Sequence, residues 1–415
     1  MFLLFLFLLP RIALPFPEEL IRIRRDVEET ALPYFVQEAH PRTGLVRDKA
    51  RNFAPTESSN RVASLAATGF GLAVIAHGAR EGQLSYGEAE AQVLRTLRFV
   101  FHSVPQHRGW LLHFVDWETG ARVWDSEFST IDTALFLAGA LYAARIFSHP
   151  EISELSHALY ARVDFSAALT DEGSKPGKRT LSLSYTPERG WTSYQWDSYA
   201  EEAILLILGI GHPTRPLPVK TWHAWRRDLM GLHMPLFIHQ YSLVFIDFRN
   251  FPEKIWNAGL AATFLHRRLG QEGFWGYSAG ESPSGYLVSS PIHFRSALCL
   301  GCALGSAMFA PEVVMRDVYE WKTGSRGSRL WGKYGLTDSI DVKKNWYSPY
   351  VLGITKGPEY LSVQNMEGRT AVWKDFMAIP EVRRAMKKIT DSYSTGAPVT
   401  REFLPRRESG TRPRR

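Results

Sequence analysis

The stretch Ala63-Ser-Leu-Ala-Ala-Thr-Gly-Phe-Gly-Leu-Ala-Val-Ile-Ala-His-Gly78 decides the fold class. It is apolar along most of its length, and Ala and Gly recur in it, which suits a helix that packs tightly against other helices. A second apolar run, Thr133-Ala-Leu-Phe-Leu-Ala-Gly-Ala-Leu-Tyr-Ala-Ala-Arg-Ile-Phe147, follows the capping-box sequence Ser129-Thr-Ile-Asp132. These segments predict a predominantly helical protein.

Helical periodicity continues on both sides of these two runs. Ser85-Tyr-Gly-Glu88 matches another capping box. The segments expected to be helical are 18–38, 63–78, 85–102, 133–147, 153–163, 199–208, 217–230, 252–269, 295–308, 311–321 and 376–389. Short strand-like pieces at 111–115 and 181–185 are of hairpin size.

A dozen or so helices joined by long loops fit either a helical solenoid or a closed ring of helix hairpins. A solenoid should repeat in sequence about every 33–47 residues, and we find no such period. We therefore expect an all-α fold, an (α/α)6 toroid of about twelve helices, with a few short hairpin strands in its loops. It should form one domain over residues 18–395.

The two ends of the 415-residue chain differ from this domain. Residues 1–17 begin with a short Phe/Leu run, which resembles the apolar part of a signal peptide or anchor and is too short to span a bilayer. We expect a periplasmic or secreted protein, or a cytoplasmic one if this run is not a signal. Residues 396–415 should be a basic, disordered tail.

Charge argues against a nucleic-acid partner. The net charge is +7, and residues 401–415 hold six Arg and two Glu, or +4, which leaves only +3 for the rest of the chain. A composition of 45% hydrophobic and 22% charged residues is that of a globular protein, and no integral membrane domain is expected.

No cofactor or metal is expected either. Dinucleotide, P-loop and zinc-protease signatures are missing from the sequence, and the His residues lack metal-ligand spacing. Cys299 and Cys302 form a single C-x-x-C within an apolar run, which we interpret as two free thiols buried in a helix.

What remains is a group of carboxylates placed among aromatic residues. One cluster, Trp124-Asp-Ser-Glu-Phe-Ser-Thr-Ile-Asp132, carries Asp125, Glu127 and Asp132. The other, Trp191-Thr-Ser-Tyr-Gln-Trp-Asp-Ser-Tyr-Ala-Glu-Glu202, ends in Glu201 and Glu202. Glycoside hydrolysis needs one protonated carboxyl at the leaving oxygen and a second carboxylate near the anomeric carbon, and aromatic rings bind sugars. The two clusters together predict a glycosidase site.

Each residue also has a structural interpretation. Asp132 is more often a helix-cap partner than a catalyst, and Glu127 is as often a dipole partner. Trp124, Trp196 and Trp275 would more often be core residues. Only one of Glu201 and Glu202 should face the interior, since adjacent helix positions point to different faces.

A third region, 235–249, places polar residues on a short apolar helix: His239, Gln240, Tyr241, Asp247 and Arg249. This set is either an internal hydrogen-bond network or a substrate-binding rim. Asp247 and Arg249 are better explained as a structural ion pair.

At these residues the chain resembles the bacterial glucoamylase-like (glycoamylase-like) family, which includes endo-β-1,2-glucanases and a domain of cyclic β-1,2-glucan synthases. The matching stretches, in order over most of residues 30–390, are His40-Pro-Arg-Thr-Gly-Leu-Val-Arg-Asp48, Ala66-Ala-Thr-Gly-Phe-Gly-Leu72, Ser126-Glu-Phe-Ser-Thr-Ile-Asp-Thr-Ala-Leu135 with Ala138-Gly139, Phe237-Ile-His-Gln-Tyr-Ser242 with Ile246-Asp-Phe-Arg249, Phe309-Ala-Pro-Glu312 and Trp331-Gly-Lys-Tyr-Gly335.

This resemblance implies an (α/α)6 toroid acting on β-glucans. It also implies that Glu201, within Tyr199-Ala-Glu201, is the acid, with Glu127 as a second candidate. The chain departs from the family pattern at Glu281, where an Asp is usual, at Arg295-Ser-Ala297 in place of Asp-Gly-Thr, and at Gln364-Asn365 in place of Glu-Asn. These changes could alter linkage preference or remove activity.

The sequence therefore predicts a cofactor-free glycoside hydrolase that cuts internal bonds of a β-glucan, with β-1,2-glucan favoured. Catalysis is assigned to Glu201, Glu127 and Asp132. Substrate binding is assigned to Trp124, Asp125, Trp196, Tyr199, His239, Gln240, Tyr241, Asp247, Arg249, Trp275 and Glu281. Two alternatives stay open: a transglycosylase on the same glucan, and a carbohydrate-binding pseudoenzyme.

Overall fold

The computed structural model describes residues 17–169, 180–225, 231–366 and 369–394, so the segment 1–16 and the tail lie outside the described residues. The described part is mostly helical. Its helices are α1 (Glu18–Gln37), α2 (Leu65–Arg80), α3 (Tyr86–Ser103), α4 (Thr130–Ile146), α5 (Pro150–Arg162), α6 (Ala203–Gly211), α7 (Leu236–Gln240), α8 (Ile255–Arg268), α9 (Leu300–Leu304), α10 (Pro311–Thr323), α11 (Gly327–Leu330), α12 (Gly353–Gln364), α13 (Ala371–Met377) and α14 (Pro380–Ser394), with 3-10 turns at Phe165–Ala168 and Val219–Thr221.

Short antiparallel strands connect these helices. They are β1 (Lys49–Arg51), β2 (Val62–Ser64), β3 (Gln106–His107), β4 (Trp110–Leu111), β5 (Phe114–Asp116), β6 (Phe128–Ser129), β7 (Ser184–Thr186), β8 (Gly190–Trp191), β9 (Ala279–Gly280), β10 (Leu287–Val288), β11 (Ala297–Cys299), β12 (Trp331–Gly332), β13 (Gly335–Leu336), β14 (Ser339–Asp341), β15 (Trp346–Tyr347) and β16 (Tyr350–Leu352). Their pairs and triplets are β1–β16, β2–β5, β3–β4, β6–β7–β8, β9–β10, β11–β14–β15 and β12–β13.

The two apolar runs form the central helices α2 and α4, which pack against each other over their whole length. Nearly every residue of both helices is buried. At the contact point, a Cβ added at Gly139 would lie 1.8 Å from the carbonyl oxygen of Gly69. Only glycine at these positions lets the two backbones approach this closely.

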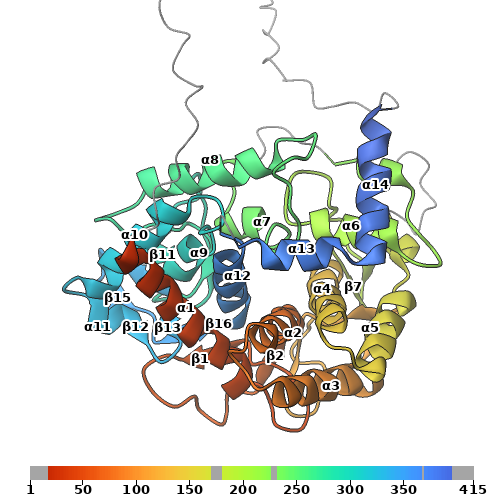
Figure 1. Ribbon diagram of the computed structural model, residues 1–415, viewed down its shortest axis with the longest axis horizontal. Coiled ribbons are helices and arrows are strands. Elements are labelled where there is room, and N and C mark those ends of the chain that lie inside the picture. The colour runs from red at the N-terminus through yellow and green to blue at the C-terminus, as the bar shows by residue number, and fades with distance from the viewer. Residues whose placement is uncertain (1–16, 170–179, 226–230, 367–368, 395–415) are drawn as a thin grey trace, which may run out of the picture.

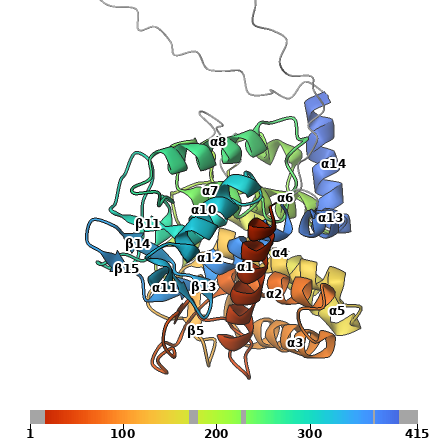
Figure 2. The same cartoon turned by 60° about the vertical axis from the view of Figure 1, so that its left-hand side comes forward.

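Other helices surround this pair. Figure 1 shows α3, α5, α14, α8 and α10 toward the rim and α2, α4 and α12 nearer the middle. The long helix α1 packs on α12, α10 and α2 (Figure 2). One apolar core surrounds α2, α4 and α6, a second surrounds α9 and α10, and Leu260 of α8 contacts both. Among the described helices none is long and apolar enough to cross a membrane.

Several helix predictions need correction. The helix expected at 199–208 begins four residues later, at Ala203. The one expected at 217–230 is a 3-10 turn at Val219–Thr221, with 226–230 outside the described residues. The segment 295–308 divides into β11 and the five-residue α9, and 376–389 overlaps two helices, α13 and α14.

The cysteine prediction is also wrong. Cys299 and Cys302 are joined by a disulfide rather than free, and Cys299 ends a strand instead of lying in a helix. Both side chains are buried, as expected, at 2% and 6% exposure. The disulfide bridges the last residue of β11 and the first turn of α9, so it fixes this strand–helix junction.

Candidate active site

The site is built from junctions at which a strand ends directly at the start of a central helix. β2 leads into α2, β6 into α4, β11 into α9 and β16 into α12. At two junctions a serine caps the helix: the Ser64 hydroxyl accepts from the Ala67 N–H, and the Ser129 hydroxyl accepts from the Asp132 N–H at 3.2 Å. Side chains at these helix starts are therefore held on a rigid frame.

Glu127 and Asp132 flank β6 and meet at one imidazole, that of His113. The Nδ1 atom of His113 lies 3.0 Å from Oε1 of Glu127, and its Nε2 atom lies 3.6 Å from Oδ1 of Asp132. Burial alone would lower the pKa of His113, but the charges of Asp132 and Glu127 raise it to about 9. For Glu127, burial alone would raise the pKa. The hydrogen bond and positive charge of His113 instead hold that pKa below its ordinary value. The site therefore holds an imidazolium between two carboxyl groups.

Glu201 joins this group from the turn before α6. The Ser242 hydroxyl donates to its carbonyl oxygen at 2.7 Å and accepts from the Ile204 N–H at 3.0 Å, which fixes the start of the helix. Burial, together with the negative charges of Asp132 and Glu202, raises the pKa of Glu201 to about 8. Glu202 is fully buried whereas Glu201 is only partly so, in line with the expectation that the two side chains face different ways. A pKa of about 8 favours the protonated form of the Glu201 carboxyl at neutral pH.

A second group of carboxylates lies beside the first. Burial raises the pKa of Asp48 to about 6 and that of Asp338 to about 6. Asp338 accepts the backbone N–H of Glu281 at 2.7 Å, and the Glu281 carboxylate lies 3.0 Å from the Lys49 ammonium. The charges of Glu281 and Asp132 both raise the pKa of Asp48, so the two groups share one region of the molecule.

Two phenols link these groups. Burial and the charges of Glu201, Asp132 and Asp338 raise the pKa of Tyr241, and the same three carboxyls and Asp48 act on Tyr286. Tyr241 is nearly buried, but Tyr286 is 50% exposed, on the loop after Glu281. Tyr286 therefore stands at the edge of the carboxylate group, open to solvent.

The predicted aromatic platforms divide into an exposed and a buried set. Trp124 is 71% exposed, and its ring contacts Phe114, which stacks on His113. Asp125 is exposed beside it. Trp196, by contrast, is buried and donates its indole N–H to the Thr130 hydroxyl at 2.9 Å. Of these two predicted tryptophan platforms, Trp124 is the one whose ring is open to solvent.

Four further predicted binding residues belong to internal networks. Tyr199 donates its hydroxyl to Nδ1 of His239 at 2.9 Å, and the opposite ring nitrogen of His239 donates to the Gly231 carbonyl. Burial lowers the pKa of His239 to about 4, so the ring is neutral. Gln240 donates to the Cys302 carbonyl and the Ser306 hydroxyl. Trp275, 1% exposed, donates to Asp317 at 2.8 Å. Their satisfied, buried groups correct the expectation that they line a substrate site.

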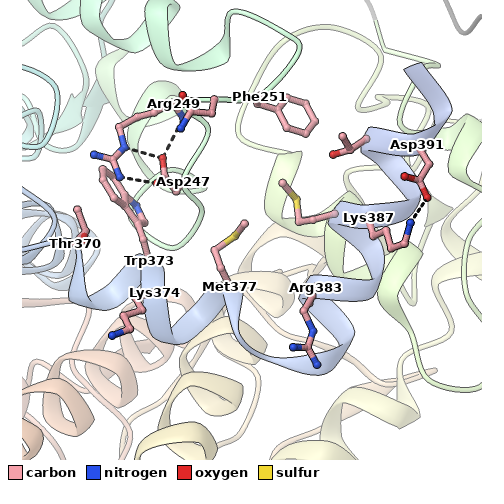
Figure 3. A pocket seen from close by; sticks show the side chains of 13 residues that line it. Asp247, Arg249, Phe251, Thr370, Trp373, Lys374, Met377, Arg383, Lys387 and Asp391 are labelled. Atoms are coloured by element: carbon pink, nitrogen blue, oxygen red, sulfur yellow. Dashed lines mark hydrogen bonds and ion pairs between the residues drawn. The ribbon is translucent and has the colours of Figure 1, made fainter. Parts of the chain in front are cut away.

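Asp247 and Arg249 lie in a separate hollow of about 590 Å3, lined mainly by α13, α14 and the turn at 247–251. Figure 3 shows the Arg249 guanidinium turned toward Asp247 at the edge of this hollow. The two residues form a bidentate ion pair with N–O distances of 2.9 and 2.7 Å. None of Glu127, Asp132 and Glu201 lines this hollow, so the structure removes Asp247 and Arg249 from the candidate site.

The structure adds four residues that the sequence analysis did not select: Asp48, His113, Tyr286 and Asp338. Asp48 ends the stretch 40–48 that resembles the family, and His113 lies in the strand-like piece 111–115, so each was close to a noted motif. No local pattern marks Tyr286 or Asp338. Among the described residues, no group of three His, Cys, Asp or Glu side chains is arranged to hold a metal ion.

Comparison with known proteins places this geometry in context. Residues 193–380 match the Glycoamylase family model, which describes proposed glucoamylases. The exo-β-1,2-glucooligosaccharide sophorohydrolase of Parabacteroides distasonis is 22% identical over 423 residues, covering 88% of this chain. The chain spans 57% of that relative's length. The resemblance to the glucoamylase-like family is thus confirmed.

Solved structures agree on the fold. An endo-β-1,2-glucanase from Chitinophaga pinensis, in complex with sophorotriose and glucose, has a TM-score of 0.77 at 23% identity, covering 89% of this chain and 98% of that one. An endo-β-1,2-glucanase mutant from Talaromyces funiculosus, in complex with β-1,2-glucan, has a TM-score of 0.68 at 12% identity, covering 90% of each chain. At these identities the likeness establishes a shared fold.

Proposed function

We propose that this protein hydrolyses β-1,2-glucan, with Glu201 as the general acid. The observation that carries the proposal is that burial and the charge of Asp132 raise the pKa of Glu201 to about 8, which favours its protonated form at neutral pH. Glycoside hydrolysis needs this asymmetry, one carboxyl neutral and a second ionised near the same bond. The linkage is proposed from the relatives, whose names specify β-1,2-glucans or their oligosaccharides.

Asp132 or Glu127 would act on water or hold the substrate. Trp124 and Tyr286 would present ring faces to the sugars, because both are exposed at the edge of the carboxylate group. We further propose that the helices close into an (α/α)6 toroid with these residues at its mouth, and that cleavage is internal to the chain. The Cys299–Cys302 disulfide supports an oxidising location, periplasmic or secreted.

The test is to incubate purified protein with linear β-1,2-, β-1,3- and β-1,4-glucans and to measure released reducing ends. The proposal predicts release from β-1,2-glucan only. Short oligosaccharides appearing at once from long chains would support internal cleavage, whereas steady release of sophorose would support action at chain ends. Rings or lengthened chains would mean transfer in place of hydrolysis. If none of the three polymers is cut, the proposed function is wrong.

A further inference from the structure

His113 is held from several sides between two of the three candidate catalytic carboxyls. Its backbone N–H donates to the Glu127 carbonyl at 2.9 Å, its carbonyl accepts from the Leu65 N–H at 3.1 Å, and its ring stacks on Phe114 with centroids 3.8 Å apart. About a third of the side chain, 32%, remains exposed. The imidazole is therefore fixed in place yet reachable from the site.

We propose that His113 is a positioning residue whose two ring N–H groups hold Glu127 on one side and Asp132 on the other, leaving Asp132 as the carboxylate that acts on water. This inference rests on the proposed hydrolase function. It assigns different roles to two carboxyls that the proposed function leaves interchangeable.

The contacts separate these roles. Oε1 of Glu127 accepts a hydrogen bond from His113 at 3.0 Å. Oδ1 of Asp132 lies 3.6 Å from Nε2 of His113, which is close enough for an ion pair but too far for a tight hydrogen bond. The negative charge of Asp132 also raises the pKa of Glu201. The acid thus has Asp132 as its partner, and Glu127 is the group that orients the imidazole.

A cation at this point offsets the repulsion between the carboxyl groups. Glu201 and Asp132 repel each other when both are ionised, and the positive charge of His113 acts against that repulsion. The carboxyl groups that face His113 are Glu127, Asp132, Asp48 and, more weakly, Glu201. The His113 ring lies 3.6 Å from Asp132, so its positive charge is placed to stabilise that carboxylate.

The reaction step balances on these two groups. Water loses a proton to Asp132 as its oxygen forms a bond to the anomeric carbon. The bond from that carbon to the leaving oxygen breaks, and this oxygen takes the proton of Glu201. His113 neither gains nor loses a proton, which distinguishes a positioning residue from a catalytic one.

The first experiment compares the pH dependence of kcat/KM on β-1,2-glucan for wild type and His113→Asn. Loss of the imidazolium removes a positive charge beside both carboxyl groups, so both limbs of the profile should move to higher pH. If the low-pH limb moves by about one pH unit, kcat/KM falls about tenfold at pH values on that limb, with KM little changed. The control His102→Asn, on the exposed end of α3, should leave both limbs in place. Should the Asn variant not fold, His113→Gln replaces it.

A second experiment needs no activity. Histidine NMR on the wild type should show the His113 ring protonated up to pH about 9, and Glu127→Gln and Asp132→Asn should each lower that pKa. An unchanged His113 titration in both variants overturns the inference, as does an active wild type whose pH limbs do not move in the Asn variant. If wild type cuts no glucan while the NMR shifts appear, the proposed function fails and the positioning of His113 stands.

Discussion

At the scale of single residues, the protonation of Glu201 is the feature with the clearest consequence. Its pKa is raised to about 8 by burial and by the charges of Asp132 and Glu202. A general acid works only while protonated. We therefore expect kcat/KM to hold from neutral pH to about 8 and to fall as the pH rises through that value. A profile measured from pH 5 to 10 tests this, and constant activity between pH 7 and 10 would exclude Glu201 as the acid.

Trp124 should bind sugar without taking part in the chemistry. Its ring is 71% exposed and adjoins Phe114 and His113. We expect Trp124→Ala to raise KM about fivefold, equivalent to about 1 kcal/mol of lost ring contact, while kcat changes little. Phe264→Ala, which removes an exposed ring on the outer helix α8, is the matched control. Equal kinetics of Trp124→Ala and wild type would remove Trp124 from the binding site.

At this scale the sequence indicates candidates where carboxylates and aromatic residues occur together in a local cluster, and the roles of these candidates stay predictions. Glu127, Asp132 and Glu201 were selected from two such clusters, and Glu201 was preferred over Glu202 because of the family resemblance. His113 could not be selected in the same way, because its role arises from contacts to residues 14 and 19 positions away that only the β4–β5 segment brings together. Trp275 and Gln240 were selected for their residue type, but the structure buries both side chains in internal hydrogen-bond networks.

At the scale of elements, the contact between α2 and α4 is the main structural constraint. Adding a Cβ at Gly139 would overlap the Gly69 carbonyl, which belongs to the backbone and cannot move aside easily. We expect Gly139→Ala to lower the free energy of unfolding by about 3 kcal/mol. Gly87→Ala in α3 is the control, since nothing lies within 4 Å of its added Cβ, and it should stabilise the protein by about 0.5–1 kcal/mol. Urea denaturation measures both; equal stability of the two variants would mean that α2 and α4 are further apart.

The disulfide between β11 and α9 gives a second prediction for an element. Closing a four-residue loop restricts the unfolded chain and is worth about 2 kcal/mol. Adding a reducing agent should lower the free energy of unfolding by about this amount and release two thiols. If the untreated native protein already contains two titratable thiols, the bridge is not formed and the sequence interpretation of free cysteines was correct after all.

Helix α12 shows why some elements escaped prediction. Its sequence, Gly-Ile-Thr-Lys-Gly-Pro-Glu-Tyr-Leu-Ser-Val-Gln, contains Gly353, Gly357 and Pro358 and lacks an amphipathic pattern, because the helix is buried on all sides. Its Lys356 and Glu359 are only 1% exposed and satisfy each other at 2.7 Å. Long apolar runs such as α2 and α4 were predictable, but a polar, buried helix is specified by its tertiary partners.

At the scale of the whole molecule, several buried acids and His113 bind protons more tightly in the folded state. Burial or nearby charges raise the pKa of Glu359 to about 7, that of Glu201 to about 8 and that of His113 to about 9. A group whose pKa is raised in the folded state stabilises the fold fully at pH values below its unfolded pKa. That stabilisation is lost as the pH rises through its folded pKa. The buried histidines with lowered pKa values, His77, His239 and His266, are still half protonated in the unfolded chain at pH 6.5. They oppose this trend until they are neutral in both states, above about pH 7.5.

We therefore expect the free energy of unfolding to fall between about pH 7.5 and 9. Urea denaturation at four pH values across this range measures it. A protein that is equally or more stable at pH 9 would show that these groups are solvated and that the carboxylate region is more open than the structure describes.

The arrangement of carboxyls at the starts of the central helices makes one claim testable above the others, namely that Glu201 is the acid of a β-1,2-glucan hydrolase. The most direct measurement is the rate at which reducing ends appear from linear β-1,2-glucan at pH 7 for wild type, Glu201→Gln and the control Glu154→Gln, whose side chain is exposed on α5. We predict that wild type and Glu154→Gln cut the polymer alike and that Glu201→Gln is slower by about 10²–10⁴-fold. A Glu201→Gln variant as fast as wild type would contradict the account.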